Sequence, residues 1–165
     1  MNAGTEHPLV INDDLIATAT RSVENAFLQL FECRVKAGQH SIHAAYASRG
    51  DISGILGMVQ DRVEATLVIT LDSGTICQVL GRLYGKEFSE INESVKQGVG
   101  ELTNIIYAGM KKTLNEKGHK FRMSIPSVVV GRDHSVYNLH QGDTLVIPFT
   151  SDDGGFFVEI ALQKL

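Results

Sequence analysis

Apolar residues recur along this chain at two different spacings, and the changes between them predict its secondary structure. Residues 12–31 carry apolar side chains at helical steps, and Asn12 is a favourable N-cap residue. Residues 52–59 and 65–71 are rich in β-branched and aliphatic side chains, which predicts two antiparallel strands joined by a short turn. The stretch 33–46 has no clear period, and we expect it to hold one irregular strand.

The second half of the chain continues with two helices followed by strands. The predicted elements are a short helix from Asp72 or Ser73 to a terminating Gly85, a polar link at 86–92, a long helix at 93–117, a strand at 121–130 that bends at Pro126, and strands at 145–149 and 156–162 joined by a hairpin connection at 151–155.

This order of elements predicts an α+β fold of two layers. The strands do not alternate one by one with helices, so a largely antiparallel sheet with long helices packed on it is expected rather than a parallel one. The chain has 165 residues, which suits a single domain spanning 1–165 with its own buried core. Residues 1–11 are expected to form a loose lead-in.

Composition narrows the classes of function. Net charge is −4 and no basic stripe interleaved with aromatic residues stands out, which argues against nucleic-acid binding. The sequence has no apolar run of the roughly 20 residues that a membrane-spanning helix requires, and no secretory signal pattern. Cys33 and Cys77 stand alone within apolar segments, so we expect reduced thiols in a cytoplasmic protein.

Three sequence motifs resemble catalytic or ligand-binding sites, but each lacks a feature that such a site requires. Gly81–Lys86 is one residue short of a phosphate-binding loop and follows a helix. His40 and His43 are the one close histidine pair, but no further ligand pattern accompanies them. Asp133, His134 and Ser135 are sequence neighbours without the turn that projects a nucleophilic serine. No metal or cofactor bound by this chain is therefore expected.

The long helix carries the strongest candidate site. An apolar stripe of Val95, Val99, Leu102, Ile106 and Met110 is predicted to face the core. At 100° per residue, Glu101 and Asn104 lie about 140° to 160° from the centre of that stripe. They are therefore expected on the exposed face, one turn apart. Gln97, Ala108, Lys111 and Asn115 fall on the same side.

Three glycines in this helix need an explanation, because each costs about 1 kcal/mol relative to alanine inside a helix. Gly98 and Gly109 lie at the flanks of the apolar stripe, where close packing would account for them. Gly100 points to the polar side. There we expect a bare patch beside Glu101 that would let another protein's backbone approach closely.

Read as a whole, the segment resembles the signature helix of the CheX/CheC chemotaxis phosphatases, whose active element is Glu-x-x-Asn on an exposed helix. The resemblance covers roughly residues 50–165 and is closer to CheX, because one such helix is present. It rests on Gly-Glu-Leu-Thr-Asn at 100–104 with Ala108, Gly109 and Lys111, on Ile69-Thr70-Leu71-Asp72 leading to Leu83-Tyr84-Gly85, and on Ser124-Ile125-Pro126-Ser127-Val128-Val129-Val130-Gly131. The chain departs from the family at Gln97, where an acidic residue is frequent, and at Ala108, because the glycine falls one residue later.

The resemblance implies a phosphatase acting on the aspartyl phosphate of a CheY-like receiver domain. Asn104 would orient the attacking water, and Glu101 would pair with a lysine of the receiver. Gln97 and Lys111 are candidate partner-binding residues, and Mg²⁺ is expected on the phosphorylated partner. The resemblance also implies a homodimer, for which Ile147–Phe149 or Val128–Val130 could offer strand edges.

Two alternatives remain open at the level of sequence. A non-catalytic module with a CheX-like or flagellar-switch-like fold would bind receivers without hydrolysing their phosphate. A structural or sensory domain would hold a small ligand on its sheet, although the strands show no converging polar groups that favour it.

Overall fold

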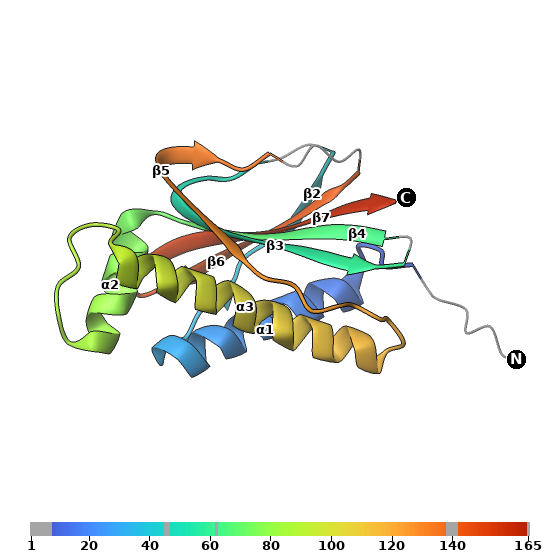
Figure 1. The fold of residues 1–165 in the computed structure, drawn as a ribbon, viewed down its shortest axis with the longest axis horizontal. Helices are drawn as coiled ribbons and strands as arrows, with labels where there is room; N and C mark the ends of the chain where they lie inside the picture. The colour runs from blue at the N-terminus through green and yellow to red at the C-terminus, as the bar shows by residue number, and fades with distance from the viewer. Residues whose placement is uncertain (1–7, 45–46, 62, 138–141, 165) are drawn as a thin grey trace, which may run out of the picture.

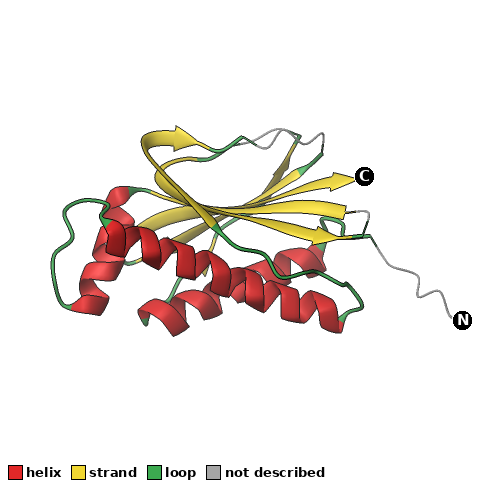
Figure 2. Cartoon of the chain, in the orientation of Figure 1, coloured by secondary structure: helices red, strands yellow, loops and turns green. Residues whose placement is uncertain are grey.

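The protein folds as one sheet with three helices on the same side, as seen in a computed structural model that describes residues 8–44, 47–61, 63–137 and 142–164 (Figures 1 and 2). The elements follow in the order α1 (Asp13–Phe31), β1 (Lys36–Ala37), β2 (Ser41–His43), β3 (Arg49–Gln60), β4 (Val63–Leu71), α2 (Ser73–Tyr84), α3 (Glu93–Glu116), β5 (Ser127–Ser135), β6 (Thr144–Ser151) and β7 (Gly154–Lys164).

The three helices begin and end close to their predicted positions because their local signals are strong. The side chains of Asn12, Asp72 and Asn92 each accept a hydrogen bond from a backbone N–H in the first turn of the helix that follows. Gly85 ends α2 in the left-handed conformation, as expected for a C-cap glycine. The predicted apolar stripe of α3 is buried throughout.

The sheet is antiparallel at every strand pair of the described residues, which confirms the predicted fold class. Its order is β1-β6-β7-β4-β3-β5, with β2 also pairing with β6. The core lies between this sheet and the helices. Stacked rings of Phe27 from α1, Phe156 from β7 and Phe149 from β6 mark its centre, with centroid separations of 4.5 Å and 5.2 Å.

Three expectations about the strands are wrong. The stretch 33–46 holds two short strands rather than one, and both pair with β6, more than 100 residues later in the chain. Residues 121–126 are not part of a strand, since β5 begins only after Pro126 and runs on to Ser135. Ile147–Phe149 is not an edge, because β6 lies between β7 and the short strands.

Helix α2 is held in place by polar contacts at both ends. At its start, the Asp51 carboxylate accepts hydrogen bonds from the backbone N–H groups of Ser73 (2.7 Å) and Asp133 (3.0 Å). These bonds, with that to Asp133 the larger cause, lower the pKa of Asp51 because they favour its charged form. Near its end, Arg82 forms an ion pair with Asp153 in the hairpin between β6 and β7.

Two simpler expectations concern cysteine and the membrane. Cys33 and Cys77 are both free and buried, as predicted. None of the helices formed by the described residues is long and apolar enough to cross a membrane.

Candidate functional site

Helix α3 presents an exposed ridge on the side opposite its buried stripe. Gln97, Glu101, Asn104 and Ala108 are all exposed along it. Glu101 and Asn104 lie three residues apart, about 4.5 Å along the helix axis. Within the described part of the chain, neither side chain has a hydrogen-bond or ion-pair partner. The predicted pair is therefore held on a rigid helix with both polar groups free to meet another molecule.

Helix α1 lies antiparallel to α3 and borders one flank of the ridge. Ser22 of α1 packs beneath Gly109, whose missing Cβ would lie 3.3 Å from the Ser22 hydroxyl, so the close packing expected at Gly109 is confirmed. Gly98 is explained in the same way by Leu80 of α2, also at 3.3 Å. The absence of side chains at these positions lets the helices approach closely.

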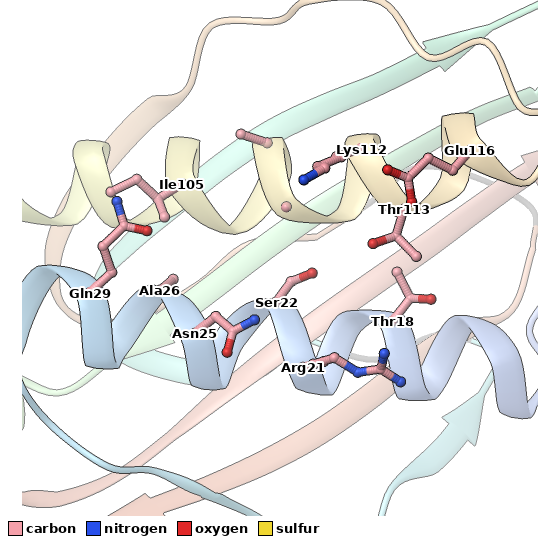
Figure 3. Close-up of a pocket in the computed structure, with 12 residues that line it drawn as sticks. Thr18, Arg21, Ser22, Asn25, Ala26, Gln29, Ile105, Lys112, Thr113 and Glu116 are labelled. Carbon is pink, nitrogen blue, oxygen red and sulfur yellow. The ribbon is translucent and has the colours of Figure 1, made fainter.

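A groove runs between the two helices beside Asn104. Its volume is about 540 Å³, and Figure 3 shows polar side chains from both helices along its walls. It begins at Ile105, the residue after Asn104, and continues past Ala108. It is lined by Thr18, Arg21, Ser22, Asn25, Ala26, Gln29, Ile105, Ala108, Gly109, Lys112, Thr113 and Glu116.

A second hollow, of about 390 Å³, adjoins Glu101 at the other end of the ridge. The ends of α1 and α2, the loop after α2 and the start of α3 enclose it. Glu101 and Gln97 form part of its wall, so the predicted site opens directly into it. Its lining residues are Leu30, Phe31, Tyr84, Lys86, Phe88, Ser94, Gln97, Gly98 and Glu101.

The opposite flank of the ridge is covered by β5 and the segment before it. A Cβ at Gly100 would lie 3.5 Å from the Val128 side chain, an ordinary van der Waals contact, so Gly100 is half-buried beside β5 rather than fully bare. The Tyr107 hydroxyl donates to the backbone carbonyl of Arg122, and Asn115 hydrogen-bonds the backbone of Phe121. Asn115 is thus a structural residue rather than part of the ridge. Lys111 is half-buried on this flank.

The motifs rejected above are accounted for by structure. His134 bonds the Ser53 hydroxyl at 2.8 Å and the Gly131 carbonyl at 2.7 Å, while Asp133 pairs with Arg49 instead. Sequence reasoning missed this Ser–His contact, but Ser53 is fully buried and also bonds Thr70, so no substrate can reach it. Among the described residues, no group of three or more His, Cys, Asp or Glu is placed to hold a metal ion.

Sequence reasoning also missed the residues of α1 and α2 that surround the ridge. Arg21, Asn25 and Gln29 are spaced at helical steps, which could have marked a polar face of α1. A polar helix face is ordinarily exposed to solvent and has no other role. This one differs because it lines the groove between α1 and α3. Tyr84 entered the sequence analysis only as part of the family resemblance, and Phe88 did not enter it, because the path of the loop that brings Phe88 beside Tyr84 is not fixed by local sequence.

The ridge is chemically suited to enter a cavity on another protein. An unpaired carboxamide can donate one hydrogen bond and accept another, which is what holding a water molecule in one orientation requires. An unpaired carboxylate one turn away can form an ion pair with a partner's cation. The groove between α1 and α3 and the hollow beside Glu101 adjoin this ridge.

Comparisons with known proteins bear on the fold and the family of this chain. The family model described as chemotaxis phosphatase CheX matches residues 52–150. A comparison with curated protein sequences gives no match. Among solved structures, a CheC-like superfamily protein from Shewanella sp. PV-4 is 31% identical with a TM-score of 0.86, covering 93% of this chain and 99% of that one. Chemotaxis protein CheX from Vibrio vulnificus is 30% identical with a TM-score of 0.82, covering 91% and 99%.

A third similar structure is a complex. CheX from Borrelia burgdorferi, solved with CheY, BeF₃ and Mg²⁺, is 23% identical with a TM-score of 0.74, covering 93% of this chain and 100% of that one. At this identity the likeness concerns the fold. The family match covers more than half of the chain and includes the α3 ridge, and the sheet and helices agree with two relatives at 30% identity or more. The chain therefore belongs to the CheX family of chemotaxis phosphatases.

Proposed function

We propose that this chain hydrolyses the aspartyl phosphate of a CheY-like receiver domain and so terminates a chemotaxis or other two-component signal. The observation that carries the proposal is the pair Glu101 and Asn104, exposed and unpartnered one turn apart on the α3 ridge. The partner class follows from the family and from the solved complex in which a CheX protein binds CheY.

Asn104 is the proposed water-positioning residue. An aspartyl phosphate is an acyl phosphate and hydrolyses on its own, so the enzyme must add a water held in line with the phosphorus in a closed site. The Asn104 carboxamide would accept a hydrogen bond from that water while donating another to a phosphoryl oxygen. Positioning of this kind is worth about 10²- to 10⁴-fold in rate, by analogy with other positioned catalytic groups.

Glu101 is the proposed docking residue. Its carboxylate would form an ion pair with a lysine beside the phosphoaspartate, which orients the complex without removing a proton from water. Mg²⁺ would be held by the receiver, where it neutralises charge on the phosphoryl oxygens. Gln97, one turn before Glu101, and Lys111, on the β5 flank, are proposed to contact the receiver outside the reacting groups. We expect this encounter in the cytoplasm, in accord with the reduced cysteines.

The test is the decay of phosphate on a CheY-like receiver with and without this protein. Wild type should accelerate the decay, and Asn104→Ala should abolish the acceleration while leaving the thermal unfolding midpoint unchanged, because Asn104 lies outside the core. Glu116→Gln is a matched control on the same helix, since Glu116 is exposed and lies about 22 Å from Glu101 along the axis. Full activity in Asn104→Ala would refute the assignment.

The same experiment addresses the non-catalytic alternative. Gln97 stands where an acidic residue is frequent in the family, so this chain could bind receivers without hydrolysis. Binding of the phosphorylated receiver with an unchanged phosphate lifetime would establish that second function and exclude the first.

A further inference from the structure

The hollow beside Glu101 has the features of a binding pocket for a side chain. Four of its lining residues are apolar or aromatic: Leu30 and Phe31 at the end of α1, Tyr84 at the end of α2, and Phe88 in the loop that follows. Its polar lining residues are Lys86, Ser94, Gln97 and Glu101. A mainly apolar lining with a small number of polar groups is typical of binding pockets.

Tyr84 is the most informative residue of this pocket. Tyr84 is 57% exposed, although it is the last residue of α2, a helix with one buried face. Its ring packs edge-on against Phe88 at 6.1 Å between centroids, and the Lys86 ammonium lies 5.3 Å from the centroid of the Phe88 ring. Tyrosine is one of the residue types enriched among the few that carry most of the affinity of protein interfaces.

The pocket walls are held by contacts outside the pocket. Asp51 and Asp153 anchor the two ends of α2. The loop after it is tied back by the bond from the Lys86 N–H to the Gly81 carbonyl (3.2 Å) and by the Cys77 thiol, which donates to the Glu90 carbonyl at 3.7 Å. A preformed pocket binds more tightly than one that must be ordered, because less conformational entropy is lost on binding.

Continuity with the ridge identifies the occupant. Glu101 and Gln97 belong both to the ridge and to the pocket wall, so a receiver that meets Glu101 must also cover the mouth of the pocket. This step rests on the proposed function. A volume of about 390 Å³ accommodates one large side chain rather than a helix or a strand.

We propose that this pocket is a second anchor for the receiver, taking one apolar or aromatic side chain from a loop that borders the receiver's phosphoaspartate. The anchor contributes affinity and choice of partner, whereas Asn104 contributes the chemistry. Tyr84, Phe88 and Lys86 are therefore specificity residues that do not touch the reacting atoms.

The test separates affinity from chemistry by measuring the dephosphorylation rate as a function of receiver concentration. Tyr84→Ala should raise the half-saturating concentration about tenfold and leave the maximal rate within about twofold of wild type. Tyr84→Phe should restore wild-type half-saturation, since the ring is needed rather than the hydroxyl. Tyr137→Ala is the matched control, because Tyr137 is 76% exposed but follows β5, away from the pocket.

A direct binding measurement keeps this proposal distinct from the proposed function. Fluorescence anisotropy of a labelled phosphorylated receiver should show weaker binding to Tyr84→Ala than to wild type, whether or not either accelerates hydrolysis. If wild type binds without hydrolysis and Tyr84→Ala binds more weakly, the pocket is supported and the phosphatase function is refuted. Unchanged affinity and half-saturation in both Tyr84→Ala and Phe88→Ala would overturn the pocket alone. Absence of any receiver binding by wild type would overturn both.

Discussion

Glu101 and Asn104 differ in chemistry, and for this reason we propose different roles for them. A carboxylate can only accept hydrogen bonds, whereas a carboxamide both accepts and donates. A second carboxylate in place of Asn104 would face the negative phosphoryl group and repel it. A carboxamide in place of Glu101 would lose the charge that attracts a lysine. The two positions are therefore not interchangeable, although they lie one turn apart on the same exposed ridge.

The role proposed for Glu101 predicts a specific response to salt. Glu101→Gln should raise the half-saturating receiver concentration at low ionic strength while changing the maximal rate much less. The difference between wild type and variant should shrink as salt is added, because an exposed ion pair is screened over about 10 Å at 0.1 M salt. Steady-state rates across a salt series measure this.

Glu116→Gln should show the wild-type salt dependence, since it removes the same charge far from the docking surface. A Glu101→Gln variant with reduced maximal rate and unchanged half-saturation would contradict the docking role. It would place Glu101 in the chemical step instead.

The position of α3 on the sheet depends on one close contact between elements. An ideal Cβ built on Gly54 of β3 would lie 1.8 Å from the hydroxyl oxygen of Thr103, which is fully buried and donates to the Val99 carbonyl at 2.7 Å. The other atoms nearest to that Cβ are the Cβ of Thr103 at 3.0 Å and a methyl carbon of Ile69 at 3.2 Å. Glycine at position 54 thus sets how deeply α3 sits and how far its ridge projects.

Gly54→Ala is therefore expected to destabilise the protein by about 2 kcal/mol or more, as overpacking of a buried contact does. Gly57→Ala on the same strand is the matched control, because nothing lies within 4 Å of a Cβ built there. It should leave stability unchanged or raise it by up to about 1 kcal/mol, because alanine loses less conformational entropy than glycine when a strand forms. Urea unfolding of both variants measures the difference, and equal stabilities would show that α3 can move away from β3 without cost.

Elements with strong local signals were predictable from the sequence, and elements defined by distant partners were not. Asn12, Asp72 and Gly85 mark helix ends through bonds within a few residues of themselves, so their sequence context was sufficient. Strands β1 and β2 exist because they pair with β6, which no local pattern in 33–46 reveals.

The candidate site divides in the same way. The ridge with Glu101 and Asn104 follows from the helical period of a single segment. The residues that flank the ridge could be identified only in the folded structure. Val128 packs beside Gly100 although it lies 28 residues further along the chain, and Tyr84 lines the pocket from the end of α2. Sequence therefore indicated which residues would be presented, but not what surrounds them.

At the scale of the whole molecule, the sheet has one long free edge. Among the described residues β5 pairs only with β3, and Val129 and Val130, whose side chains point to opposite faces of the strand, are 39% and 43% exposed. Just before it, Met123 and Ile125 are 89% and 88% exposed. An exposed edge with apolar side chains is prone to pair with another strand. The homodimer implied by the family resemblance stays a prediction, and this edge is where we place it.

Wild-type protein is accordingly expected to have twice the 18.0 kDa chain mass in light scattering coupled to size exclusion. Val129→Lys should shift it to the mass of one chain, because a charged side chain on an edge strand opposes pairing with a second copy. Val10→Lys is the matched control, since Val10 is 41% exposed but lies outside the sheet, ahead of α1.

A monomeric wild type would exclude the dimer, and a dimeric Val129→Lys would place its interface elsewhere. Val128 of the same strand packs against Gly100 at the ridge. If Val129→Lys both abolished the dimer and slowed dephosphorylation, the dimer interface would therefore support the position of the ridge.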